Sequence, residues 1–218
     1  MTEKLQKKIE NGREYRSMMM EARAEEQENH IVEGYATTFD EPYHLYTDEK
    51  GREVKEQVSR DAFLNTDMSD VIMQYDHEGR VFARLSNNTL KLETDEHGLK
   101  VTADLGGTEI GRNLYEEIKG GYTNKMSFGF TVANDEVTRA GDGFLRTIKS
   151  IGKLFDVSAV SLPANNLTEI SARNHCDGAI AEIDEEIHRQ EEEQRILAEK
   201  KENLLAKLNA LKGESNEN

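Results

Sequence analysis

The sequence predicts an α+β protein that is mainly a closed or partly closed β-barrel, with helical insertions and a C-terminal helical extension. Between residues 30 and 176, most segments have the short alternating pattern of strands, and few have the period of a helix. After residue 176 the pattern changes to a heptad repeat without aromatic residues. These changes divide the chain into an N-terminal arm (1–29), a barrel domain (30–176) and a helical tail (177–218).

The N-terminal arm, residues 1–29, is polar and of mixed charge, and Met18-Met19-Met20 is its one apolar patch. Alanine and glutamate are frequent, which favours a solvated or frayed helix. We expect a flexible terminus here, with a removable leader or an assembly arm as alternatives. The first twelve residues lack the apolar core of a secretory signal.

Six strand patterns precede the middle of the chain. Each is short and has alternating or continuous apolar residues. They lie at 31–36, 52–58, 71–75, 81–85, 89–94 and 99–105. The stretch 39–51 is expected to be a long acidic connection. The last two strands flank Asp95-Glu96-His97-Gly98 and predict a β-hairpin.

An amphipathic helix is predicted from Gly107 to Lys119. Ile110, Leu114 and Ile118 recur every four residues and therefore lie on one face of a helix. The pair Gly120-Gly121 is expected to end this helix.

The stretch Lys125–Phe130 is predicted to be a strand with Ser127 in its middle. Phe128 and Phe130 share one face of this strand, and Ser127 and Gly129 share the other. Glycine has no side chain, so room is expected beside Ser127. This suits a serine nucleophile, although a plain edge strand has the same pattern. The strand is expected to continue to 132, followed by a polar loop at 134–143 and strands at 144–151 and 153–162.

Composition excludes several classes of function. The net charge of −15 argues against non-specific binding to nucleic acid and against docking on an anionic membrane, and it favours solubility. No run is long enough to span a membrane. Cys176 is the only cysteine, so an internal disulfide or a cysteine-based zinc site cannot form. The histidines lack the spacing of metal ligands, so no metal or cofactor is expected.

The tail, residues 177–218, has a heptad register in which seven of ten core positions are isoleucine or leucine: Ile180, Ile183, Ile187, Leu197, Leu204, Leu208 and Leu211. Gln190, Gln194 and Lys201 interrupt the seam. A lone helix cannot bury such a seam, so the pattern favours a coiled coil or a helical hairpin. The alternative is an amphipathic helix folded back on its own domain.

Three residues of the barrel region are candidates for serine-protease chemistry. Histidine can take the proton of a serine hydroxyl, and a carboxylate can hold the histidine in the required tautomer. We therefore consider His77 as the base, Ser127 as the nucleophile and Asp156 as the carboxylate. Sequence spacing does not show that they meet, and each also has a structural interpretation as a turn or exposed strand residue. Ser158 and Ser161 are competing nucleophiles, and both are expected to be exposed strand positions.

The order of these motifs resembles the prohead (capsid maturation) serine proteases of tailed bacteriophages. The resemblance is collinear over about residues 30–173 and is carried by five stretches: Val58–Phe63, Asp76-His77-Glu78-Gly79-Arg80, Leu99–Leu105, Met126-Ser127-Phe128-Gly129-Phe130, and Phe155-Asp156-Val157-Ser158 continuing to Ser161-Leu162-Pro163-Ala164-Asn165. That family is similar in fold to herpesvirus assemblin proteases, in which helices surround a β-barrel.

The resemblance implies a serine endopeptidase that cleaves scaffold and capsid proteins, and itself, inside the prohead in the host cytoplasm. It matches Ser127 to the nucleophile and His77 to the general base. The family usually has Glu-Val-Ser where this chain has Asp156-Val157-Ser158, so the shorter aspartate is expected to need a backbone shift or a bridging water. The resemblance also suggests a dimer, and backbone N–H groups near Pro163-Ala164-Asn165 are candidate oxyanion donors.

Two other functions remain open at the level of sequence. A non-catalytic capsid assembly or scaffolding protein would retain the barrel and bind partners through the helical tail, which could pair with scaffold or with a second copy. A hydrolase of small esters fits the same three residues. It is disfavoured because the chain lacks a Gly-x-Ser-x-Gly elbow.

Overall fold

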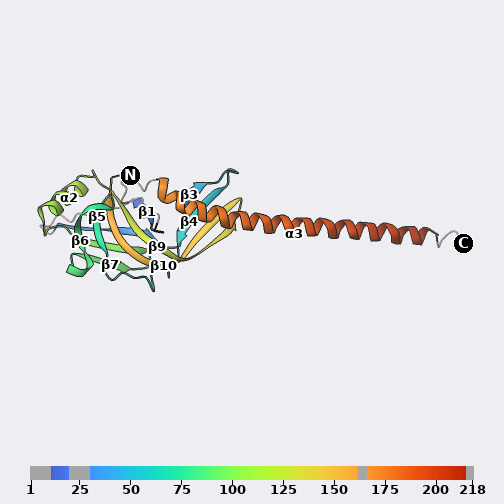
Figure 1. The fold of residues 1–218 in the computed structure, drawn as a ribbon, viewed down its shortest axis with the longest axis horizontal. Helices are drawn as coiled ribbons and strands as arrows, with labels where there is room; N and C mark the ends of the chain where they lie inside the picture. Colours follow the sequence, from blue (N-terminus) through green and yellow to red (C-terminus); the bar gives the residue numbers. More distant parts are fainter. Residues whose placement is uncertain (1–10, 20–29, 162–165, 215–218) are drawn as a thin grey trace. The chain divides into compact units, whose positions relative to one another are not determined.

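The computed structural model describes residues 11–19, 30–161 and 166–214 (Figure 1). The chain divides into two compact units, residues 1–176 and residues 177–218, which we describe separately.

Two sheets make up the first unit. The larger sheet contains β1 (Glu14–Met19), β3 (Tyr43–Thr47), β4 (Glu53–Val58), β5 (Ile72–Tyr75), β6 (Glu78–Arg84), β9 (Lys125–Ala140) and β10 (Gly143–Val160). The smaller sheet contains β2 (Ile31–Thr38), β7 (Leu90–Thr94) and β8 (Gly98–Asp104), in the order β2-β8-β7. The predicted strands at 31–36 and 52–58 and the predicted hairpin at 89–105 are therefore confirmed.

The long strand β10 joins distant parts of the chain. It pairs antiparallel with β9 along most of its length (Figure 1). Its first half also pairs in parallel with β4, and its second half pairs in parallel with β5. Several register shifts between β9 and β10 mark bulges, which bend and twist a strand. Because β10 changes neighbours along its length, the strand that carries Asp156 lies beside both the Ser127 strand and the strand that leads to His77.

The predicted α+β class is confirmed, but the predicted barrel is not found. The described strands lie in two separate mixed or antiparallel sheets and do not close into one barrel. The predicted loop at 134–143 is also wrong, because 134–140 continues β9 and pairs with the start of β10. Likewise, the acidic connection at 39–51 contains the strand β3.

Strand β1 lies within the range predicted to be a polar arm. The predicted frayed helix is wrong for residues 14–19, which pair antiparallel with β9 so that Ser17 faces Ser127. Tyr15 is buried on one side of this strand, while Glu14 and Arg16 are buried on the other. The charges of this segment are therefore interior groups with partners, which composition alone does not reveal.

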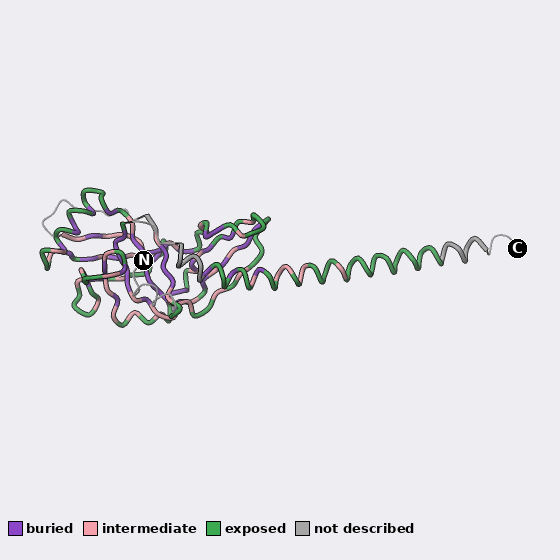
Figure 2. The backbone as a smooth tube through the Cα atoms, turned by 45° about the horizontal axis from the view of Figure 1, so that its top comes forward, coloured by how far each residue is buried: buried purple, intermediate pink, exposed green. Residues whose placement is uncertain are grey.

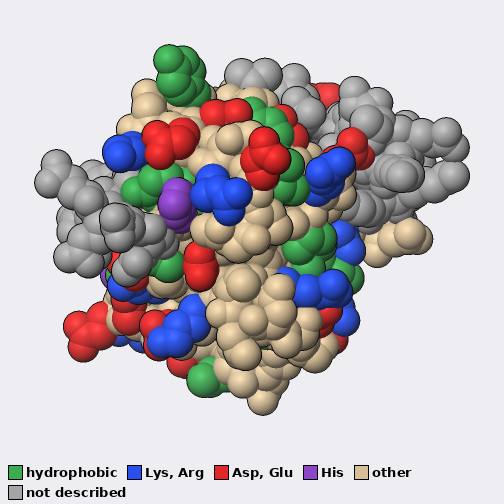
Figure 3. Space-filling view, turned by 90° about the vertical axis from the view of Figure 1, so that its left-hand side faces the viewer, with side chains coloured by type: hydrophobic (Ala, Val, Ile, Leu, Met, Phe, Trp, Pro, Cys, Tyr) green, Lys and Arg blue, Asp and Glu red, His purple; other side chains and the backbone are tan. Residues whose placement is uncertain are grey.

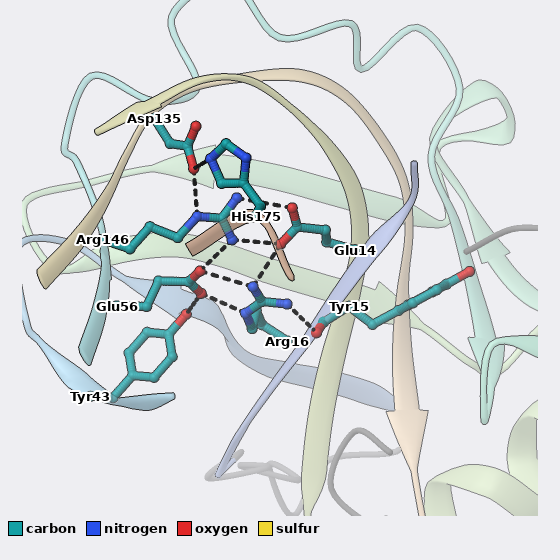
Figure 4. A network of polar contacts seen from close by, with 8 residues as sticks. All are labelled: Glu14, Tyr15, Arg16, Tyr43, Glu56, Asp135, Arg146 and His175. Carbon is teal, nitrogen blue, oxygen red and sulfur yellow. Dashed lines mark hydrogen bonds and ion pairs between the residues drawn. The ribbon is translucent and has the colours of Figure 1, made fainter. Parts of the chain in front are cut away.

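A buried network of charges holds β1, β4, β9 and β10 together, with Tyr15 pointing away from it (Figure 4). The Glu56 carboxylate accepts hydrogen bonds from Arg16 Nη2 and Arg146 Nη1, both at 2.8 Å. Arg146 also donates to Glu14 at 2.8 Å and to Asp135 at 2.5 Å. Since buried charges require partners, these contacts explain why acidic residues occur inside strands that pair with one another.

The hydrophobic core of the first unit includes apolar side chains from both sheets and from α2 (Glu109–Lys119), and Figure 2 shows many buried segments of the chain in purple. Helix α2 begins after Thr108, whose hydroxyl caps the Gly111 N–H, and it buries Leu114 and Ile118. The predicted helix is thus confirmed. On the face shown in Figure 3, acidic and basic side chains are interspersed.

Helix α3 runs from Asn166 to Glu214. Residues 177–214 of the second unit form one uninterrupted helix, so the predicted alternative of a helical hairpin is wrong. No helix in the described part of the chain has the length and apolarity needed to cross a membrane.

Candidate active site

His77 lies in the tight turn that joins β5 to β6. Asp76 and His77 have φ angles of 49° and 61°, as in the type I′ turns that connect two adjacent strands. The Asp76 carboxylate accepts hydrogen bonds from the backbone N–H and the hydroxyl of Ser161, each at 2.8 Å. The Asp76 N–H donates to the Ala159 carbonyl at 2.9 Å. These bonds tie the turn to the end of β10 and so fix the position of the imidazole.

The His77 imidazole contacts the Asp156 carboxylate directly, Nδ1 to Oδ1, and both side chains are buried. Burial raises the pKa of the Asp156 carboxyl, but the contact with His77, the hydrogen bond from Ser158 and the charge of Arg13 outweigh it, so the pKa lies below its ordinary value. An ionised carboxylate only accepts hydrogen bonds, so this contact requires a proton on His77 Nδ1. The shorter aspartate therefore needs no bridging water.

Ser127 lies beside this pair through strand register. It stands directly opposite Ser158 in the β9–β10 ladder, and Gly129 stands opposite Asp156. Side chains at directly opposed positions lie on the same face, with Cβ atoms about 4.5–5.5 Å apart. The structure therefore joins His77 to Asp156 by contact and places Ser127 next to the serine that binds Asp156. Within the described part of the chain, the buried Ser127 Oγ has no hydrogen-bond partner.

The faces of the Ser127 strand are as predicted, but the expected room beside Ser127 is filled. The rings of Phe128 and Phe130 are both buried and stack with centroids 4.6 Å apart. A Cβ atom at Gly129 would lie 2.6 Å from Asp156 Oδ2 and 2.7 Å from the Tyr15 ring. Glycine is therefore required at this position for Asp156 and Tyr15 to approach the strand.

Two residues at this site, Tyr15 and Arg13, were not identified from the sequence. The Tyr15 ring lies against the His77 ring, with centroids 4.3 Å apart. Burial and the charge of Asp156 raise the pKa of Tyr15 to about 12, so its phenol stays neutral. Arg13 Nη1 lies 3.7 Å from Asp156 Oδ2, and its guanidinium covers the Phe155 ring. Arg13 and Tyr15 are two residues apart, which places them on one face of an extended chain, and this spacing was the available signal in the sequence. It lies in a segment whose composition predicts a polar arm.

The competing nucleophiles have other roles in this structure. Ser158 was expected to be exposed, but it is buried and its hydroxyl donates to Asp156 Oδ1 at 2.8 Å. Ser161 is exposed, as predicted, and binds Asp76. Burial raises the pKa of the Cys176 thiol to about 12, which keeps it protonated at neutral pH. The candidate oxyanion donors at 163–165 lie outside the described residues.

Replacing Gly129 with alanine is expected to disturb both the fold and the site. The added methyl group would overlap Asp156 and Tyr15, so we expect a loss of about 1–3 kcal/mol in the free energy of unfolding and a lower rate of peptide cleavage. Gly152→Ala is the matched control, because a Cβ there would be 3.3 Å from its nearest neighbour, the Thr131 hydroxyl. Thermal unfolding and the rate of peptide cleavage, measured for both variants, test this expectation. A Gly129→Ala protein as stable and active as Gly152→Ala would contradict this geometry.

Comparison with known proteins adds one match. A protein-family model described as caudovirus prohead serine protease matches residues 18–179. No curated protein and no solved structure matches the chain. The matched range contains His77, Ser127 and Asp156, whereas Arg13 and Tyr15 precede it.

Proposed function

Because the family model covers most of its length, the chain belongs to the caudovirus prohead serine proteases, and we propose that Ser127, His77 and Asp156 carry out its peptide cleavage. The observation that supports this most directly is the contact between His77 Nδ1 and Asp156 Oδ1. A buried carboxylate at Nδ1 is the arrangement that prepares Nε2 to accept a serine proton.

In the proposed mechanism, Ser127 Oγ attacks the carbonyl carbon of the scissile peptide bond as His77 Nε2 takes the hydroxyl proton. The Asp156 carboxylate stabilises the resulting imidazolium. The imidazolium then gives its proton to the leaving amine as the C–N bond breaks, which leaves an acyl group on Ser127. Water hydrolyses this ester by the same proton transfers in reverse order. Tyr15 holds the imidazole ring in place from one side.

The described state is closed to a peptide substrate. The Ser127 side chain has no exposed surface, and His77 is 6% exposed. A substrate must therefore displace part of what covers Ser127 before its carbonyl can reach the hydroxyl. A resting state of this kind would keep capsid and scaffold subunits intact until they have assembled.

The proposed substrates are scaffold and capsid proteins, together with the enzyme itself, within the prohead in the host cell. Family membership supports this substrate class. We assign to the tail of residues 177–218, whose described residues 177–214 are helical, the role of a pairing element, which would bring the enzyme into the shell through scaffold or through a second copy. The described side chains in its C-terminal half are largely exposed, as such a role requires.

Intact-mass spectrometry over time tests the peptidase assignment. With scaffold protein added, the unmodified chain is expected to shorten itself or the scaffold, and Ser127→Ala is expected to leave both whole. Ser158→Ala is the matched control, since it removes a second buried hydroxyl from the same face but should retain cleavage. If the unmodified chain leaves every protein whole, the alternative of a non-catalytic assembly protein is favoured. If Ser127→Ala still cleaves while Ser158→Ala does not, Ser158 is the nucleophile.

A further inference from the structure

The second unit exposes an apolar stripe along its helix. Leu197 and Leu204 are each 68% exposed, and Leu205 is 52% exposed. Figure 2 shows that most of this helix is exposed. Apolar side chains at heptad spacing are stable in water when another helix covers them. Ile180 is buried, so the available stripe begins after it.

We propose that the same helix of a second copy covers this stripe and that the two helices run antiparallel. This rests on the role proposed above for the helix as a pairing element, and not on the assignment of the peptidase residues. The proposal is carried by the uneven distribution of charge along the helix. Residues 182–193 contain seven acids and one arginine, whereas residues 195–207 contain four bases and two acids.

A parallel pair would place like charges together. In the heptad register set by Ile187 and Leu197, Glu186 would lie beside the partner's Glu191. At the core of the same pair, Lys201 would face the partner's Lys201. Each of these contacts is repulsive, and together they disfavour the parallel arrangement.

An antiparallel pair places opposite charges together. When the pair is centred between Gln194 and Leu197, Ile187 of one helix faces the partner's Leu204 at the core. Beside the core, Glu186 lies near the partner's Lys207 and Glu193 lies near the partner's Lys200. Twofold symmetry repeats each contact, which makes four attractive pairs.

The contacts within one helix are compatible with this pairing. Glu186 interacts along its own helix with Arg189 and Gln190, and both of those residues are exposed. In the described part of the chain, Glu193, Lys200 and Lys207 have no ion-pair partner. At the core, Lys201 faces the partner's Gln190 instead of another lysine, which removes the main obstacle to association.

Charge reversal in the full chain tests the pairing. Analytical ultracentrifugation of the unmodified chain is expected to show a concentration-dependent dimer. Glu186→Lys with Glu193→Lys should raise the dissociation constant about 10-fold or more, as should Lys200→Glu with Lys207→Glu. Mixing the two variants should restore dimers, because all four flanking pairs become attractive again. Glu185→Lys with Glu199→Lys, at positions away from the seam, is the control and should leave the constant unchanged.

Disulfide trapping tests the orientation. An oxidised mixture of Ile187→Cys and Leu204→Cys chains should form a mixed disulfide dimer, and Ile187→Cys alone should not cross-link to itself. The buried Cys176 is common to all samples. Self-cross-linking of Ile187→Cys would show a parallel pair, and an unmodified chain that stays monomeric at high concentration would overturn the dimer. Because these measurements report association alone, their failure would be separate from a failure of the peptidase assignment.

Discussion

Replacing Asp156 with asparagine is expected to lower kcat for peptide cleavage about 10⁴-fold. An asparagine amide can donate a hydrogen bond to His77 Nδ1, which stabilises the tautomer with its proton on Nε2. In that tautomer, Nε2 cannot accept the Ser127 proton. The measurement is kcat on a peptide that spans a cleavage site found by mass spectrometry, with thermal unfolding to confirm that the variant is folded.

The control for this substitution is Ser158→Ala. It removes the 2.8 Å hydrogen bond to the same carboxylate but leaves the charge, so we expect a loss of about 10-fold or less. The lowered pKa of Asp156 means that its carboxylate stays ionised across neutral pH. The Asp156 charge should therefore remain available for cleavage by the unmodified enzyme near neutral pH. Full activity in Asp156→Asn would show that another group orients His77.

Replacing Glu56 with glutamine is expected to lower the free energy of unfolding by about 3–5 kcal/mol, because removing one member of a buried ion pair leaves its partners uncompensated. Glu56 has no exposed surface and binds both Arg16 and Arg146. For a chain of this size the change corresponds to a fall of about 6–20 °C in Tm. Glu136 is an exposed residue of β9 that pairs with Lys149, and Glu136→Gln should change the free energy of unfolding by about 0.5 kcal/mol or less. Equal Tm values for the two variants would contradict a stabilising role for the network.

The same network predicts loss of stability in acid. Burial raises the pKa values of Glu14 and Glu56, but the hydrogen bonds and charges of Arg16 and Arg146 outweigh it and leave both below their ordinary value. A carboxylate with a lowered pKa in the folded state contributes stability above its unfolded pKa of about 4.3, and this contribution is lost as the pH falls further. At pH values below about 4, Tm should therefore decrease as the pH is lowered. This decrease should be less steep in Glu56→Gln than in the unmodified chain.

Local periodicity was sufficient for much of the fold. The hairpin at 89–105 and the helix at 107–119 depend on contacts between residues that are close in sequence, so their patterns are visible there. Prediction failed where charged residues are interior. Glu14, Arg16 and Asp135 belong by type to a solvated surface. The buried partner of Arg16 is Glu56, 40 residues away in the sequence, and that of Glu14 is Arg146, 132 residues away. Strand β1 and the extension of β9 were therefore missed, and so was the division of the strands into two sheets.

The order and residue types of the motifs identified His77, Ser127 and Asp156 as candidates and indicated the family to which the chain belongs. The tertiary structure decided which of them meet. His77 reaches Asp156 because a left-handed turn is anchored to the end of β10, and Ser127 lies alongside because β9 pairs with β10 in one particular register. It also brought Tyr15 and Arg13 to the same site from a segment that composition places outside the domain. A sequence specifies side-chain chemistry and local periodicity, whereas the pairing of β10 with both β5 and β9 sets the register that brings these side chains together.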